Sequence, residues 1–109
     1  MRNRLQLLQE ILAKTPNDSF ALFAIAKEYE GRGENSQALY HYLQLRSADS
    51  DYVGLYYHLG KLYEKTGNPE AALEAYQAGM AVAKKLGDNH AYSELNGARF
   101  ELDDTDDDY

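Results

Sequence analysis

The chain has 109 residues, enough for one small domain, and its 18 acidic and 11 basic side chains give a net charge of −7. This acidic balance argues against a nucleic-acid-binding protein, which needs clustered Lys and Arg. The absence of cysteine excludes disulfides, a CxxC zinc site and a thiol nucleophile. Five of the acids lie in residues 103–109, so residues 1–102 hold thirteen acids against eleven bases, and the acidity belongs mainly to a tail.

Apolar residues recur at helical spacing along the chain and predict six helices and no sheet. The first helix is expected to end before Pro16, and Asp18 can cap the second. Gly31-Arg32-Gly33 supplies residues that turn at positive φ and so ends the second helix. Asn35 is then the expected cap of the third helix.

The segment Thr66-Gly67-Asn68-Pro69 is the clearest of these breaks. Gly67 suits the end of one helix, Asn68 the cap of the next, and Pro69 the first helical position, where its missing N–H costs nothing. Leu86-Gly87-Asp88 repeats the pattern of a glycine stop and an acidic start.

The N-terminus carries Arg2 and Arg4, but the residues that follow are amphipathic, because Gln6, Gln9 and Glu10 interrupt the apolar block that a signal peptide would keep. No run of 18 or more apolar residues occurs, so no membrane-spanning helix is expected. These two observations predict a cytoplasmic protein without membrane contact.

The chain repeats itself with a period of 34 residues. Sliding the sequence by this period superimposes residues 19–52 on 53–86 without a gap. The identical pairs are Lys27/Lys61, Tyr29/Tyr63, Glu30/Glu64, Gly33/Gly67, Ala38/Ala72, Leu39/Leu73 and Tyr42/Tyr76. Because the shared positions are mainly packing and turn residues, a common structural unit explains them.

The spacing within each copy resembles the tetratricopeptide repeat, whose signature runs W-x2-L-G-x2-Y…A-x3-F…P. The second copy reads Tyr56-x2-Leu59-Gly60-x2-Tyr63…Ala72-x3-Tyr76, and the first reads Leu22-x2-Ile25-Ala26-x2-Tyr29…Ala38-x3-Tyr42. The final Pro is absent from both copies, where Ser50 and Lys84 stand instead.

The resemblance implies an all-α fold, a right-handed helical-repeat solenoid of about six antiparallel helices. Residues 1–102 are expected to form one domain, self-sufficient because its six helices make three pairs. Its parts are a half repeat at 2–15, full repeats at 19–52 and 53–86, and a capping helix at 88–102. Residues 103–109 are expected to be a disordered acidic tail; an alternative is that this tail folds back over Lys27 and Lys61.

No constellation for catalysis is found. His41, His58 and His90 lie on separate helices, and the motifs HExxH, GxSxG, GxxxxGK[ST] and GxGxxG are absent. We therefore expect a protein that is not an enzyme, with no cofactor and no metal site.

In the tetratricopeptide repeat family the first helix of each pair lines a concave peptide-binding groove. The matching positions give the candidate groove residues Phe20, Phe23, Lys27, Tyr57, His58 and Lys61. Phe20, Phe23 and Lys27 form one stripe at i, i+3 and i+7, and Lys27 and Lys61 recur although an exposed Lys has no packing reason to do so. Alternatively, the aromatic residues only pack between helices and the lysines keep the surface soluble.

These features predict a non-catalytic protein–protein interaction module, an adaptor or assembly scaffold. Aromatic rings beside Lys suit a partner peptide with apolar anchors and an acidic or carboxylate group. The carboxylate clamp of chaperone-binding relatives is disfavoured, because Phe23, Lys27 and His58 occupy positions where the clamp has Lys, Asn and Asn. The alternative function is a homo-oligomeric building block that self-associates through its groove or solenoid end, since ten tyrosines favour interfaces.

Overall fold

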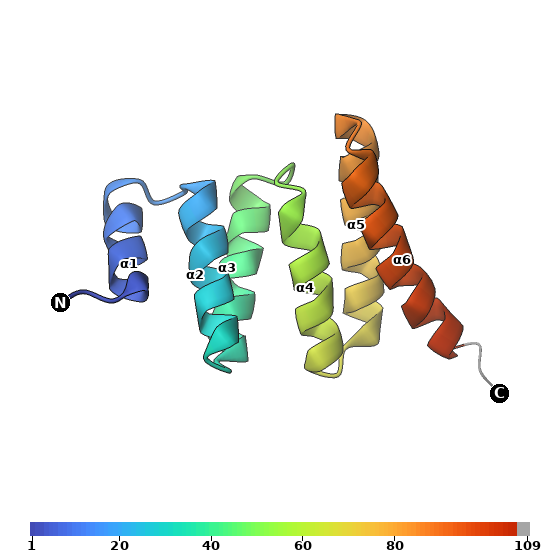
Figure 1. The fold of residues 1–109 in the computed structure, drawn as a ribbon, viewed down its shortest axis with the longest axis horizontal. Helices are drawn as coiled ribbons and strands as arrows, with labels where there is room; N and C mark the ends of the chain where they lie inside the picture. The colour runs from blue at the N-terminus through green and yellow to red at the C-terminus, as the bar shows by residue number, and fades with distance from the viewer. Residues whose placement is uncertain (107–109) are drawn as a thin grey trace. The chain divides into compact units, whose positions relative to one another are not determined.

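The computed structural model describes residues 1–106, and the side chains of residues 1–103. This part of the chain contains six α-helices and no strands, as Figure 1 shows, so the predicted all-α class is confirmed. The helices are α1 (Arg4–Lys14), α2 (Ser19–Gly31), α3 (Asn35–Ala48), α4 (Gly54–Lys65), α5 (Pro69–Leu86) and α6 (Asn89–Asp106).

The chain divides into two compact units at the point where the two 34-residue copies meet. The first unit is Met1–Tyr52 and contains α1, α2 and α3, and the second begins at Val53 and contains α4, α5 and α6. Each unit therefore holds one complete pair of helices, α2 with α3 or α4 with α5, and one additional helix.

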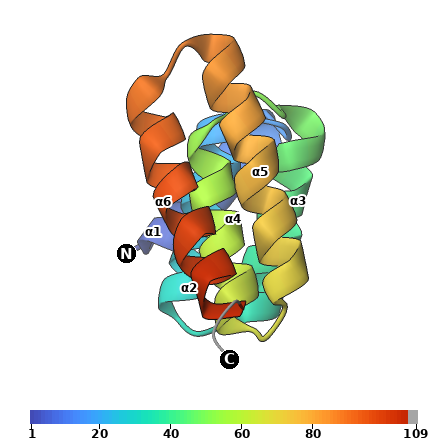
Figure 2. The same ribbon diagram turned by 90° about the vertical axis from the view of Figure 1, so that its right-hand side faces the viewer.

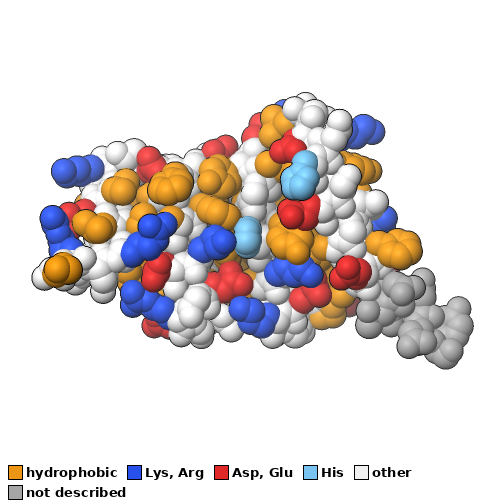
Figure 3. Space-filling view, viewed as in Figure 1, with side chains coloured by type: hydrophobic (Ala, Val, Ile, Leu, Met, Phe, Trp, Pro, Cys, Tyr) orange, Lys and Arg blue, Asp and Glu red, His pale blue; other side chains and the backbone are white. Residues whose placement is uncertain are grey.

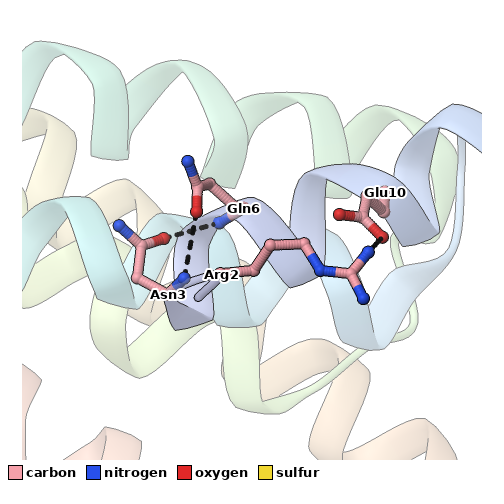
Figure 4. Close-up of polar contacts among 4 residues, drawn as sticks. All are labelled: Arg2, Asn3, Gln6 and Glu10. Atoms are coloured by element: carbon pink, nitrogen blue, oxygen red, sulfur yellow. Dashed lines mark hydrogen bonds and ion pairs between the residues drawn. The ribbon is translucent and has the colours of Figure 1, made fainter.

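Helix α1 begins with a capping box, shown in Figure 4. The Asn3 side chain accepts a hydrogen bond from the Gln6 backbone N–H at 2.9 Å, and the Gln6 side chain accepts one from the Asn3 N–H at 3.0 Å. This reciprocal pair satisfies two N–H groups that lack partners within the helix. Beside it, Arg2 Nη1 lies 2.6 Å from Glu10 Oε1.

The three glycine stops adopt the left-handed conformation expected of them. The φ angles are +75° at Gly33, +82° at Gly67 and +70° at Gly87. In each turn the residue after the glycine donates its N–H to the carbonyl oxygen of the residue five positions earlier in the chain. Glu34 donates to Tyr29 at 2.9 Å, and Asn68 donates to Tyr63 at 2.8 Å. These bonds close the ends of α2, α4 and α5.

The predicted caps at Asp18 and Asn68 are confirmed, because their side chains accept from Ala21 N–H and Ala71 N–H at 2.9 and 3.3 Å. The cap predicted at Asn35 is wrong. Asn35 is the first residue inside α3, and Glu34, which makes no side-chain capping bond, precedes it. The connection between α2 and α3 consists of Arg32, Gly33 and Glu34, so α3 begins one residue earlier than a cap at Asn35 requires.

The first unit packs α1 against α2 through a small apolar cluster. Its buried members are Leu8, Ala24 and Ile25, and its partly buried members are Leu5, Leu12 and Tyr29. The stripe Leu5, Leu8 and Leu12 therefore forms the inner face of α1.

The second unit depends on close approaches at two glycines. Figure 2 shows α4, α5 and α6 side by side. A Cβ at Gly60 of α4 would lie 2.6 Å from Cζ of Tyr76 on α5, so only glycine leaves room for this ring. A Cβ at Gly79 of α5 would lie 3.0 Å from Tyr56 Cγ on α4 and from Leu95 Cδ1 on α6. Gly79 is thus the point at which all three helices of the unit meet.

Helix α6 extends beyond residue 102, where the sequence places the end of the capping helix. It continues to Asp106, and Arg99 Nη1 contacts Asp103 Oδ2 at 2.9 Å, an i,i+4 ion pair that supports the added turn. The first part of the predicted acidic tail is therefore helical, and residues 107–109 lie outside the described residues. In the described part of the chain, no helix is long and apolar enough to cross a membrane.

We predict that Gly60→Ala lowers the free energy of unfolding by about 1–3 kcal/mol, because the added methyl group enters the space of the Tyr76 ring. The matched control is Gly97→Ala in α6, where nothing lies within 4 Å of a Cβ. The control should raise stability by up to about 1 kcal/mol through helix propensity. Urea unfolding followed by circular dichroism measures both, and equal stability of Gly60→Ala and wild type would contradict the close approach.

Candidate functional site

Helix α2 carries three of the predicted groove residues on one exposed stripe. Phe20 is 61% exposed, Phe23 is partly buried and Lys27 is exposed. The Lys27 ammonium lies 5.8 Å from the centroid of the Phe23 ring, within the range of a cation–π contact. The predicted stripe at i, i+3 and i+7 is therefore a continuous surface of one aromatic ring, a second aromatic ring and a cation.

An open cavity of about 370 Å³ lies beside this stripe, within the first unit. It is lined by Arg4, Phe20, Phe23, Ala24, Lys27 and Glu28. Figure 3 shows hydrophobic and basic side chains next to one another over α1 and α2. Glu28 lies 3.6 Å from Arg4 Nε and 3.7 Å from Arg32 Nε, so one carboxylate is shared by two guanidinium groups. The cavity thus keeps a net positive charge.

Helix α4 carries the corresponding residues of the second unit. The Lys61 ammonium lies 5.5 Å from the centroid of the Tyr57 ring, and 3.9 Å from Glu64 Oε2. The His58 ring meets the Tyr57 ring edge-on, with centroids 5.8 Å apart. All three predicted residues of this helix, Tyr57, His58 and Lys61, are partly buried.

A buried tyrosine supports the aromatic ring of each pair. The centroid of the Phe23 ring is 6.2 Å from that of Tyr42, and the centroid of the Tyr57 ring is 6.5 Å from that of Tyr76. Both Tyr42 and Tyr76 are fully buried. The two units therefore repeat the same arrangement as well as the same residue types. In each, a Lys lies over a partly buried aromatic ring, and that ring packs on a fully buried tyrosine.

The hydroxyl groups of these tyrosines donate to carboxylates near the ends of the first helices. Tyr42 donates to Glu30 Oε1 at 2.7 Å, and Tyr76 donates to Glu64. Burial raises the pKa of both tyrosines well above the usual 10, and the hydrogen bond and negative charge of the glutamate raise it further. The bond explains why Glu30 and Glu64 are identical in the two copies.

The structure places the six predicted residues as two sets of three, one on α2 and one on α4. Sequence reasoning missed Arg4 and Glu28, which line the cavity from α1 and from the flank of α2. No periodic signal could reveal them, because Arg4 lies outside the two full copies and Glu28 has Leu62 as its counterpart. In the described part of the chain, no three His, Cys, Asp or Glu side chains group so as to hold a metal ion.

Known proteins with similar sequences and structures identify the family. No protein-family profile matches the chain. A TPR repeat-containing protein of Pseudomonas aeruginosa is 28% identical over 88 residues, which span 81% of the chain and 84% of that protein. The crystal structure of a tetratricopeptide repeat domain protein from Salinibacter ruber is 38% identical, covers 79% of the chain and 96% of that structure, and has a TM-score of 0.75. The chain belongs to the tetratricopeptide repeat family.

A third relative extends the similarity over nearly the whole chain. The solution structure of a protein from Bordetella parapertussis is 25% identical, covers 97% of the chain and 92% of that structure, and has a TM-score of 0.83. Tetratricopeptide repeat proteins are generally non-catalytic interaction modules. The fold of this member therefore suggests a protein–protein interaction module.

We predict that Tyr42 and Tyr76 keep their protons at a pH at which exposed tyrosines have ionised. Unfolded tyrosines ionise near pH ~10, whereas the folded pKa of these two is higher, so the folded state binds more protons above that pH. Their stabilisation is fully present below about pH 10 and is lost as the pH rises further. The free energy of unfolding should therefore fall as the pH is raised through this range, and ultraviolet absorbance should show two tyrosines that ionise only on unfolding.

The variant Tyr42→Phe/Tyr76→Phe should lose about 1 kcal/mol per hydrogen bond at neutral pH but show a shallower fall in alkali. Tyr40→Phe, at a residue that is 63% exposed, is the control and should change neither. If all tyrosines of the folded wild type ionised over the same pH range, this result would contradict the buried hydrogen bonds of Tyr42 and Tyr76.

Proposed function

We propose that the chain is an adaptor or assembly module that binds acidic peptide segments of a partner protein, through one Lys and aromatic pair on α2 in the first unit and one on α4 in the second. One observation carries the proposal: both units place a Lys ammonium over an aromatic ring on the first helix of the pair, at 5.8 Å for Lys27 on Phe23 and 5.5 Å for Lys61 on Tyr57. These are groove positions in the family, and a cation that recurs over a partly buried ring has no evident reason in packing alone.

The charge of these positions favours a carboxylate ligand. Lys27 has no ion-pair partner among the described residues, and Lys61 reaches only Glu64, at 3.9 Å in a partly exposed pair. A pair of this kind contributes little, about 0–1 kcal/mol. An Asp or Glu of the partner gains a charge-assisted hydrogen bond at either Lys without breaking a strong internal contact.

The cavity in the first unit supplies the apolar part of the recognition. Phe20 offers an exposed ring, Phe23 forms a wall supported by Tyr42, and Arg4 adds a second cation at the rim. An aromatic or aliphatic side chain next to an acidic residue matches this combination, because large apolar anchors bind in pockets and charges lie at their edges. The preferred segment therefore contains an apolar residue flanked by Asp or Glu.

Packing alone is the competing explanation for the aromatic rings. Phe23 also contacts Tyr52, with centroids 5.3 Å apart, so its ring has a structural role in any case. The lysines decide between the two explanations, since their ammonium groups are not needed for the packing of the rings. The test therefore changes the lysines and leaves the rings in place.

We predict that Lys27→Gln/Lys61→Gln reduces recovery of the partner at least about tenfold, because each lost charge-assisted contact costs roughly 1.5 kcal/mol or more. The partner is first captured on the immobilised wild-type chain and identified by mass spectrometry. The matched control is Lys14→Gln/Lys84→Gln, which removes the same charge from exposed positions outside α2 and α4.

A peptide from the captured partner then tests the ligand chemistry. Replacing its Asp and Glu by Asn and Gln should abolish binding, and higher salt should weaken binding of the unchanged peptide. Equal recovery by the two double variants, or equal binding of the amide peptide, would contradict an acidic ligand on α2 and α4.

A further inference from the structure

Helix α1 exposes an apolar stripe beside its packed face. Leu7 and Ile11, one turn apart, are 46% and 40% exposed, whereas the inner face of the helix is buried against α2. Arg4 lies one turn before Leu7 and Lys14 lies one turn after Ile11. These four residues, called the α1 stripe, form an apolar pair with a cation at each end.

Helix α6 exposes a second apolar feature on its outer side. Phe100 is 64% exposed, and one turn earlier Gly97 has nothing within 4 Å of a Cβ position. The opposite side of the helix is buried through Leu95 and Ala98. Ser93, Gly97 and Phe100 together, called the α6 face, present a large ring beside an open stretch of backbone that another helix can approach closely.

The two helices have opposite charges. Helix α6 holds five acids, Glu94, Glu101, Asp103, Asp104 and Asp106, against Arg99, a net charge of −4. Helix α1 holds Arg4 and Lys14 against Glu10, a net charge of +1, and Arg2 precedes it. Two α6 helices would repel each other, whereas a basic apolar surface complements the acidic helix around Phe100, and the α1 stripe has both properties.

We propose that the α1 stripe of one copy packs against the α6 face of a second copy. The helices run antiparallel, because the acidic end of α6 then lies beside Arg2 and Arg4 at the start of α1, and the two helix dipoles are also opposed. Leu7 and Ile11 cover Gly97 and contact Phe100. The contact is heterologous: each copy contributes a different surface to each of its two neighbours.

This contact shares Arg4 with the cavity of the proposed peptide site but uses neither Phe23 nor Lys27, and the variants that test it leave Arg4 unchanged. A single pair of helices buries less surface than a standard stable interface of about 1,600 Å². The association is therefore weak, and the associated fraction increases with protein concentration. Salt reduces the association because part of the attraction is between charges.

The test is sedimentation of the 109-residue chain over a range of concentrations up to about 1 mM, where weak contacts of this size are populated. Two variants each block one surface: Leu7→Glu/Ile11→Glu keeps the α6 face, and Gly97→Glu/Phe100→Glu keeps the α1 stripe. All four changed residues are exposed, and circular dichroism verifies that both variants are folded. The wild type should associate in a way that weakens at about 1 M salt, and each variant alone should be monomeric.

Mixing the two variants is the decisive measurement. One intact α6 face and one intact α1 stripe remain, so the mixture should form a one-to-one complex and stop there. The control Tyr40→Glu/Leu43→Glu removes an exposed apolar pair of α3 and should associate as the wild type does. Lys27→Gln/Lys61→Gln should also associate normally, which separates this contact from the proposed peptide site.

Three results would overturn the proposal. They are a wild type that stays monomeric throughout the concentration range, self-association of either blocked variant alone, and a mixture of the two variants that forms no complex although the α3 control associates.

Discussion

A buried tyrosine on the second helix of each pair holds the structure together. Tyr76 lies against the bare backbone of Gly60, and its hydroxyl donates to Glu64, so one side chain of α5 contacts α4 at two points. Tyr42 makes the same hydrogen bond to Glu30 between α2 and α3. Without these rings the aromatic residues of the candidate site would lose their support, because Phe23 and Tyr57 each rest on one of them. Fold and candidate site thus share one contact in each unit.

The candidate surface is therefore an extension of the packing and not a separate addition to it. From the core outward, each unit has a neutral tyrosine kept protonated by burial, then a partly buried aromatic ring, then a cation at the surface. Such an arrangement gives a ligand a rigid apolar platform and a mobile charge, which suits recognition of a short segment with few residues in contact. Variation of the outer residues can change the ligand while the tyrosine below remains the same, as expected of a fold that hosts many binding specificities.

Local sequence rules predicted the elements well where one residue decides the outcome. Gly33, Gly67 and Gly87 take the left-handed turn because no side chain opposes it, and the tetratricopeptide spacing gave the repeats and six candidate residues. The cap of α3 was misplaced because Asn35 has a better capping side chain than Glu34, although the 34-residue period maps Asn68 onto Glu34. The contribution of Arg4 and Glu28 to the cavity could not be predicted from the sequence. It depends on how α1 packs on α2, and this tertiary contact has no counterpart in the second copy of the repeat.

The length of α5 shows that the second copy keeps the 34-residue period with a longer helix. Helix α3 has 14 residues and α5 has 18, although the two copies align without a gap. The four additional helical residues, 83–86, stand where the first copy has residues 49–52, which follow α3. Four residues make slightly more than one helical turn and rotate the next position by only about 40°, so the buried face keeps its direction, and Ala83 on this added turn is buried. A connecting segment can therefore become helical without changing the length of the repeat or the side chains that face inward.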